Sequence, residues 1–166
     1  MKRAALFLLL AVLSIGAQKP VARLGGVWSL DLKESQGLPA AFNGVESFTM
    51  VVKQRPDSLV VAIQMAGGGQ NVSLPVNVYR FNGREVFHED TARGTKRWMK
   101  AQWSGNGRTL TIVNRVESRA GGKEQRYTQT DTWRMAGRDV LRVMATTKFK
   151  DSDSSRTQTR IFHRVK

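Results

Sequence analysis

Hydrophobic and polar residues alternate in short runs along most of the chain, a pattern typical of strands that bury one face. In the run 27–32, Trp28, Leu30 and Leu32 fall on one face, and Ser29 and Asp31 fall on the other. The pattern predicts about ten strands, at 27–32, 47–53, 58–65, 72–81, 84–89, 96–103, 109–117, 125–135, 140–150 and 156–165.

Short connections rich in glycine and asparagine separate most of these runs, as at Asn82-Gly83 and Gly105-Asn106-Gly107. Glycine and asparagine supply the positive φ that tight hairpins need. Connections this short join only antiparallel neighbours, and a long meander removes its exposed edges by closing on itself. The sequence therefore predicts an all-β fold, a single antiparallel up-and-down β-barrel of about 8–10 strands.

The first residues have the pattern of a secretory signal peptide. Met1-Lys2-Arg3 is basic, residues 4–13 are apolar, and residues 14–17 end in the small residues Gly16 and Ala17. Ten apolar residues are too few to cross about 30 Å of hydrocarbon as a helix. We therefore expect a signal peptide at 1–17 with cleavage near Ala17, a barrel domain at 18–166, and a location in the periplasm or the extracellular medium.

The composition removes several kinds of chemistry. The chain has no cysteine and two histidines, which excludes a disulfide framework, a thiolate zinc site and a cysteine nucleophile. His88, Glu89 and Asp90 are consecutive, so in a strand they cannot all point to one ion. Neither a Gly-x-Ser-x-Gly motif nor a phosphate-binding glycine loop occurs. We therefore predict no catalytic residue, no metal, no cofactor and no enzyme activity.

Positive charge is concentrated in the second half of the chain. The formal net charge is +14, and residues 80–166 hold twenty Lys and Arg against nine Asp and Glu. This excess attracts polyanions and anionic envelope surfaces, or equally forms a solvated outer face. Arg97 and Lys100 lie near Trp98 and Trp103, an arrangement that can stack nucleic-acid bases, but export argues against a nucleic-acid partner. A monomer is expected.

The predicted inner face is built mostly from medium-sized aliphatic residues, which can leave a hollow in a barrel of this size. It consists of Trp28, Leu30, Leu32, Phe48, Met50, Val52, Leu59, Val61, Ile63, Met65, Val72, Leu74, Val76, Val78, Leu110, Ile112, Val116, Leu141, Val143, Ala145 and Phe149.

Polar residues interrupt this face late in the chain, where they could orient a small ligand. The candidate ligand-binding residues are Asn114, Tyr127, Gln129, Asp131, Trp133 and Thr147. In strand 125–135 the opposite face, with Thr128, Thr130 and Thr132, is the alternative. Burial of the large aromatic residues favours the Tyr127 and Trp133 face.

The long connection 33–44 breaks the hairpin pattern and places Leu38 and Phe42 together. These two residues either cover the mouth of the barrel as a lid or belong to a helical turn that plugs it.

Gly26-Val27-Trp28 resembles the G-x-W signature that begins the first strand of lipocalins, and residues 26–35 look like the opening of small secreted bacterial lipocalin-like domains. The resemblance implies a barrel for a small hydrophobic or amphipathic molecule, with no settled function for the bacterial branch. It also implies that Trp28 closes the bottom of the barrel beneath Arg160 or Arg164. The chain departs from the lipocalin pattern in having no disulfide, no T-D-Y turn motif and no helix after the barrel strands.

Two functions of different kinds follow. The first is an exported barrel that binds a small hydrophobic or amphipathic ligand, with an anionic group suited to Arg97, Arg134 or Arg142. The second is a basic extracytoplasmic adhesion module that binds polyanions through its outer surface. An internal void of roughly 300 Å³ or more favours a carrier, and close packing favours a scaffold.

Overall fold

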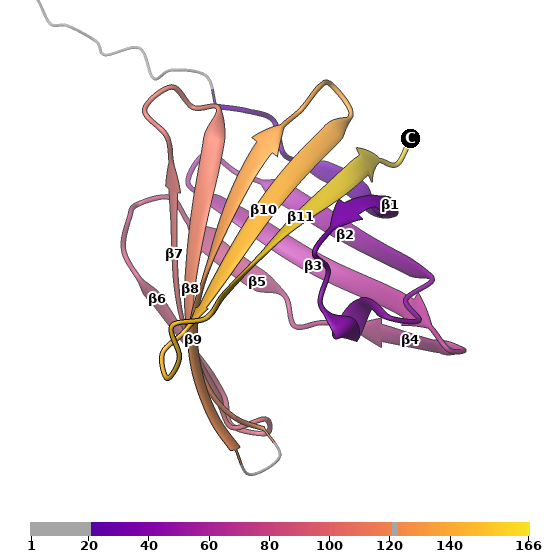
Figure 1. The fold of residues 1–166 in the computed structure, drawn as a ribbon. Coiled ribbons are helices and arrows are strands. Elements are labelled where there is room, and N and C mark those ends of the chain that lie inside the picture. Colours follow the sequence, from indigo (N-terminus) through magenta and orange to yellow (C-terminus); the bar gives the residue numbers. More distant parts are fainter. Residues whose placement is uncertain (1–20, 121–122) are drawn as a thin grey trace, which may run out of the picture.

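The computed structural model describes residues 21–120 and 123–166, which form one antiparallel sheet of eleven strands (Figure 1). The predicted signal segment, residues 1–17, lies outside the described residues. The strands are β1 (Gly26–Gln36), β2 (Ser47–Gln54), β3 (Ser58–Gly67), β4 (Gln70–Ser73), β5 (Asn77–Arg80), β6 (Val86–Asp90), β7 (Thr95–Trp103), β8 (Thr109–Ala120), β9 (Lys123–Met135), β10 (Val140–Phe149) and β11 (Ser155–Arg164). A short 3-10 helix, η1 (Ala40–Phe42), lies between β1 and β2. Within the two described ranges, no helix is long and apolar enough to cross a membrane.

The sheet has up-and-down topology, which confirms the predicted fold class. Its strand order is β4-β3-β2-β1-β11-β10-β9-β8-β7-β6. Strand β5 pairs with residues 58–61 of β3, and β4 pairs with residues 64–67 of the same strand. Strands that follow one another in sequence are neighbours from β1 to β4 and from β6 to β11, and β11 returns to pair with β1. One break interrupts the circuit, because β5 pairs with β3 and β6 pairs with β7 but the two ends of the sheet share no backbone ladder. We call this break the seam.

The structure has eleven strands where about ten were expected, because the run 72–81 is divided in two. Leu74, Pro75 and Val76 separate β4 from β5, and proline cannot donate a ladder hydrogen bond. The predicted inward face of this run, Val72, Leu74, Val76 and Val78, is wrong, because its three valines are exposed.

In β5 the residues that point inward are Asn77 and Tyr79. They lie opposite Val61 and Leu59 of β3, whose side chains are buried. Side chains directly opposite in an antiparallel pair share one face of the sheet, so Tyr79 is buried and Val78 faces out.

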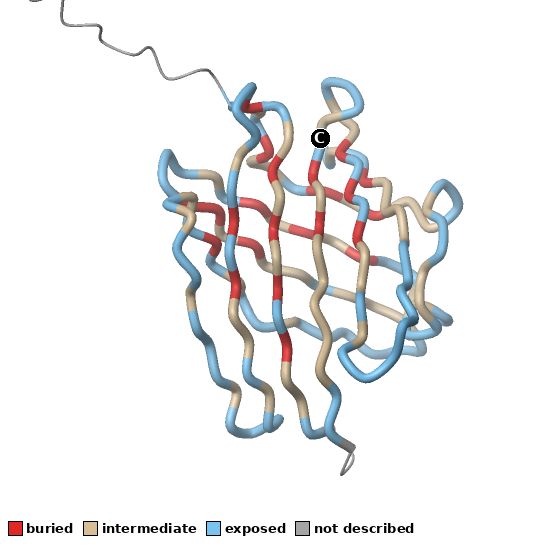
Figure 2. The backbone as a smooth tube through the Cα atoms, turned by 60° about the vertical axis from the view of Figure 1, so that its left-hand side comes forward, coloured by how far each residue is buried: buried red, intermediate tan, exposed pale blue. Residues whose placement is uncertain are grey.

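The sheet curls so that its first strands cross behind its last ones (Figure 1). Buried residues alternate with exposed ones along the strands and lie mainly toward the end that holds the C-terminus (Figure 2). The core is apolar and draws on nearly every strand. Its members include Leu24, Trp28, Leu30, Phe48, Met50, Val52, Leu59, Val61, Met99, Ala101, Leu110, Ile112, Leu141, Val143 and Phe162.

Trp28 and Arg164 pack against each other on the neighbouring strands β1 and β11. Trp28 is fully buried, and its Nε1 donates a hydrogen bond to the carbonyl of Leu24 at 2.9 Å. The Arg164 guanidinium lies 4.2 Å from the centre of the Trp28 ring and donates to the carbonyl of Gly25 at 2.7 Å. Arg164 is opposite Trp28 in the β1–β11 register, so it meets the indole directly. Arg160, the other arginine named for this position, lies four residues along β11 and points into the interior elsewhere.

Gly26 explains how the guanidinium fits there. Its φ is +145°, and a Cβ at this position would collide with Nη1 of Arg164. The backbone conformation therefore favours the glycine of the G-x-W motif, and any larger residue would also have to displace the Arg164 guanidinium.

Candidate functional site

An internal cavity of about 150 Å³ lies between the two halves of the sheet. Eight strands, β2, β3, β5 and β7–β11, contribute to its wall, so the cavity exists only in the folded sheet. The wall is formed by Phe48, Met50, Val61, Ile63, Asn77, Tyr79, Arg97, Asn114, Val116, Tyr127, Gln129, Asp131, Trp133, Val143, Arg160 and Phe162. The volume is half of the internal void that the sequence analysis took to favour a carrier. It is close to the volume of a cavity that admits benzene.

A small residue opens this space beside the polar side chains. Ala145 on β10 is fully buried and lies directly opposite Asp131 on β9. Because Ala145 ends at Cβ, Arg160 on β11 reaches across β10 and places Nη2 3.5 Å from Oδ2 of Asp131. The ion pair thus bridges two strands that are not neighbours in the sheet.

Asp131 is the buried acid of the cavity. Asp131 is 7% exposed, and its Oδ1 accepts a hydrogen bond from Nε2 of Gln129 at 2.8 Å. Burial raises the pKa of the Asp131 carboxyl above its ordinary value, and the nearby Arg160 and Gln129 offset only part of this effect. Burial also raises the pKa of the Tyr79 phenol, so the phenol stays neutral at physiological pH.

Three buried polar atoms on the cavity wall have no hydrogen-bond partner within the described part of the chain. They are Oδ1 of Asn114, Nε1 of Trp133 and Nε of Arg160. Nε1 of Trp133 lies close enough to Asp131 to favour its charged form, without reaching hydrogen-bond geometry. Leaving a buried polar atom unpaired costs about 1–3 kcal/mol, and these three wall residues leave two donors and one acceptor unmatched.

Five of the six predicted ligand-binding residues line this one cavity: Asn114, Tyr127, Gln129, Asp131 and Trp133. The predicted register of β9 is confirmed, because Asp131 and Trp133 are buried on its inner face. Thr147 does not line the cavity. It lies opposite Gln129, whose longer side chain reaches Asp131, whereas the threonine side chain is too short to reach the cavity.

The two predicted lid residues do not line the cavity either. Phe42, in η1, stacks on Phe48 with ring centres 5.7 Å apart, and Phe48 is part of the wall. Leu38 is half-buried in the same connection. Phe42 therefore packs against the core through a wall residue.

Four polar residues of the wall were not predicted from the sequence to line a cavity: Asn77, Tyr79, Arg97 and Arg160. The register of β5 was read from its valines, which hid Asn77 and Tyr79. Arg97 was considered for an anionic group and for base stacking beside Trp98, and Arg160 only as a partner of Trp28. Their common signal was parity, because each lies on the same face as buried residues of its own strand.

A second hollow of about 260 Å³ lies beside the cavity and shares four wall residues with it, Asn77, Arg97, Val116 and Tyr127. We call it the outer pocket. Its remaining residues come from the β4–β5 connection, from β6 to β8 and from the β6–β7 turn, so it lies at the seam. Nη1 of Arg97 on β7 donates to Oδ1 of Asn77 on β5 at 3.0 Å, which ties the two sides of the seam together.

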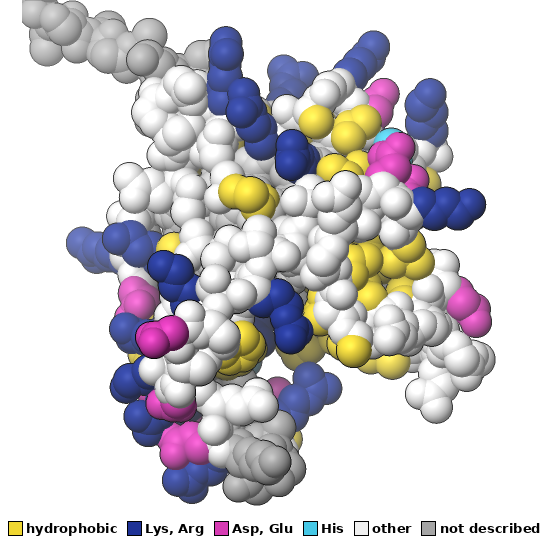
Figure 3. Space-filling model, viewed as in Figure 1, with side chains coloured by type: hydrophobic (Ala, Val, Ile, Leu, Met, Phe, Trp, Pro, Cys, Tyr) yellow, Lys and Arg dark blue, Asp and Glu magenta, His cyan; other side chains and the backbone are white. Residues whose placement is uncertain are grey.

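Lys and Arg side chains are spread over the outer surface and outnumber Asp and Glu on the face shown in Figure 3. On the outer face of the sheet, Arg134 and Arg142 are directly opposite each other and exposed. Neither forms an ion pair with a described residue, whereas Arg115 pairs with Glu85 at 3.1 Å.

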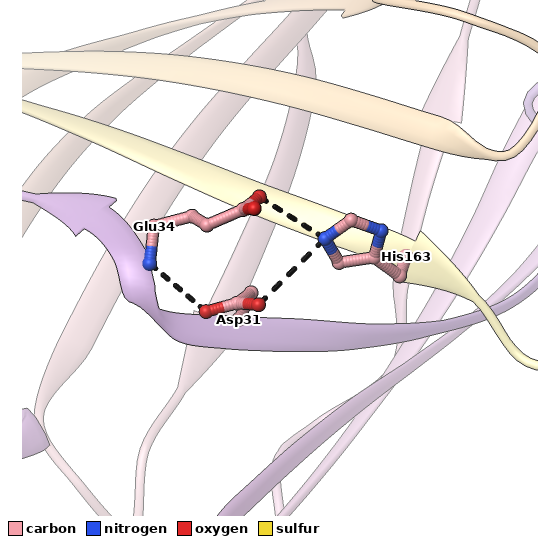
Figure 4. A group of neighbouring side chains, drawn as sticks. All are labelled: Asp31, Glu34 and His163. Atoms are coloured by element: carbon pink, nitrogen blue, oxygen red, sulfur yellow. Dashed lines mark hydrogen bonds and ion pairs between the residues drawn. The ribbon is translucent and has the colours of Figure 1, made fainter.

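A separate polar group joins β1 to β11 at the surface (Figure 4). Nε2 of His163 lies 3.1 Å from Oε2 of Glu34 and 3.7 Å from Oδ2 of Asp31. Oδ1 of Asp31 accepts the backbone N–H groups of Lys33 and Glu34, and the Glu34 bond in particular lowers the pKa of Asp31. The β1–β11 register shifts between Asp31 and Gln36, so these contacts hold a bulge in β1 against β11. A structural role accounts for the group.

No protein-family model matches this chain, and no curated protein is similar to it. Among solved structures, Human cRBP IV has a similar arrangement over 87% of this chain and 99% of that chain, with 18% sequence identity and a TM-score of 0.49. The strand pairing defines the fold, and the positions of the cavity-wall residues define the site.

Proposed function

We propose that this protein binds a small amphipathic molecule inside its barrel. The observation that carries the proposal is the cluster of three unpartnered polar atoms on the wall of one partly apolar cavity. A guest with a flat apolar body would contact Phe48, Val61 and Trp133. Its acceptor would meet Nε of Arg160 or Nε1 of Trp133, and its donor would meet Oδ1 of Asn114.

The cavity volume limits the guest. Ligand pockets commonly hold 300–1,000 Å³, and this cavity has about 150 Å³, so the guest has about the size of a single substituted ring. The proposal retains the predicted amphipathic ligand and narrows it to a molecule smaller than a long-chain fatty acid. Export, proposed from the N-terminal pattern, would place this binding outside the cytoplasm.

Benzamide is a suitable probe, because its ring is apolar and its amide carries both a donor and an acceptor. Titration calorimetry and ligand-observed NMR should detect saturable binding to the purified protein. Val143→Phe points a larger side chain into the cavity and should weaken binding at least about ten-fold, or about 1.4 kcal/mol. Met144→Phe, the next residue of β10 with its side chain facing out, is the matched control and should bind as the wild type does.

Absence of saturable binding to the wild type would overturn the proposal. Equal loss in both variants would also count against it, because the outward residue cannot fill the cavity.

The paired arginines on the outer face favour a second candidate function, the binding of polyanions. Like charges directly opposite on a sheet repel each other, and an anion that bridges Arg134 and Arg142 would relieve the repulsion. Heparin-column retention should fall in Arg134→Gln/Arg142→Gln, and unchanged elution salt would refute this candidate.

A further inference from the structure

The seam places one arginine between the cavity and the outer pocket. Arg97 lines both hollows and is half-buried. Its Nη1 donates to Asn77, whose amide oxygen is neutral. A guanidinium has five donors, so a single neutral partner leaves most of its hydrogen-bonding capacity for other groups.

The other two arginines of these hollows already have carboxylate partners. Arg160 pairs with Asp131 at 3.5 Å in the cavity, and Arg93 pairs with Asp90 at 3.8 Å in the outer pocket. Among the residues that the structure describes, Arg97 forms no ion pair. Arg97, at the junction of the two hollows, is therefore the one arginine of these hollows whose charge no described carboxylate compensates.

The charge of the surroundings points the same way. The one carboxylate on the cavity wall, that of Asp131, already contacts Arg160 and Gln129, so it does not compensate Arg97. Removing a half-buried guanidinium from water costs less free energy when an anion binds it. A carboxylate can accept two parallel hydrogen bonds from the guanidinium.

From this arrangement we infer that the ligand of the proposed cavity is a small organic acid, whose carboxylate binds Arg97 at the seam while its apolar body occupies the cavity. The inference rests on the proposed function and adds the charge of the ligand and the residue that selects it. The sequence offered Arg97, Arg134 and Arg142 for an anionic group. Only Arg97 reaches the cavity, since Arg134 and Arg142 are exposed on the outer face.

The outer pocket gives the carboxylate a route to Arg97 from solvent. Asn77, Arg97, Val116 and Tyr127 are common to both hollows, so Arg97 borders the cavity on one side and the outer pocket on the other. A carboxylate can replace the Asn77 oxygen as acceptor, with the stronger hydrogen bond that a charged group makes.

Benzoate and benzamide test this inference, because they have nearly the same shape and differ in charge at pH 7. Wild-type protein should bind benzoate roughly ten-fold or more tightly than benzamide, measured by calorimetry at low ionic strength. Arg97→Met keeps the length of the side chain and removes its charge. It should weaken benzoate roughly ten- to hundred-fold and weaken benzamide, which has no negative charge, much less, so that the ratio of the two affinities falls.

Lys100→Met is the matched control, because Lys100 lies on the same strand and its exposed side chain faces out. It should leave both affinities unchanged, which separates a contact with Arg97 from a general effect of charge. Arg97→Lys should recover part of the benzoate affinity.

The outcomes distinguish this inference from the proposed function. If the wild type binds benzamide at least as tightly as benzoate, or if Arg97→Met leaves the ratio of the two affinities unchanged, the acid-binding role of Arg97 is wrong and the cavity proposal stands. If neither compound binds the wild type, the proposed function fails and this inference fails with it.

Discussion

Replacing Asn114 with leucine should stabilise the protein while it weakens ligand binding. Asn114 is 8% exposed on the inner face of β8, and its Oδ1 is buried without a partner among the described residues. Leucine has the same branched shape and number of heavy atoms, suits the apolar neighbours on the wall and carries no polar atom. The substitution therefore removes an uncompensated polar group without creating a cavity.

The expected gain follows from the cost of an unpaired polar atom. That cost is about 1–3 kcal/mol, so Asn114→Leu should raise the free energy of unfolding by a similar amount. For a chain of this size, each kcal/mol corresponds to roughly 2–4 °C in Tm. Urea unfolding followed by tryptophan fluorescence, with the slope compared between variants, measures the change without assuming a ligand.

The same substitution should weaken benzamide about ten-fold, because the acceptor for its N–H group is lost. Asn114→Asp is the informative companion. It keeps the shape and puts a second carboxylate beside the same cavity as Asp131, so it should lower stability at neutral pH.

Two results would refute this reasoning. A loss of more than about 1 kcal/mol in Asn114→Leu would show that Oδ1 is satisfied in solution, for instance by ordered water. Unchanged benzamide affinity would show that Asn114 does not contact the guest.

Further predictions concern Asp131, Trp28 and Gly26. The pKa of Asp131 is higher in the folded state than in the unfolded state. Above about pH 4 the folded state therefore binds more protons than the unfolded state. As a result, Asp131 makes the free energy of unfolding fall as the pH rises from about 4 to the folded pKa. Asp131→Asn should remove that part of the slope of unfolding free energy against pH, and an identical slope in the variant would contradict the assignment. Trp28→Ala should cost about 3–5 kcal/mol in urea unfolding, and a loss below about 1 kcal/mol would show that the indole is not part of the core. Gly26→Ala should displace the Arg164 guanidinium from the Trp28 ring, which NMR of the arginine side chain detects as a change in its ring-current shift.

Alternation along the chain was enough to predict the antiparallel sheet, its up-and-down order and most of its core. The same rule assigned the inner face of β9, because burying Trp133 outweighs burying threonine methyl groups. It failed in β4 and β5, where Pro75 separates two short strands and the valines belong to the outer face.

The site was harder to predict because its contacts join residues far apart in the chain. Arg160 meets Asp131 across β10, and Arg97 meets Asn77 across a seam that no backbone ladder spans. Those distances depend on how the sheet curls and on the small side chain of Ala145. Alternation specifies the face of a residue and leaves such contacts open.

The central claim is that the cavity takes up a small amphipathic molecule, and the most direct measurement is a crystal structure of the protein soaked with benzamide. Ring density should appear between Val61 and Trp133, with the amide within hydrogen-bond distance of Oδ1 of Asn114. A cavity that keeps an unchanged set of ordered waters at saturating benzamide, each atom of the polar cluster bonded to water, would contradict it.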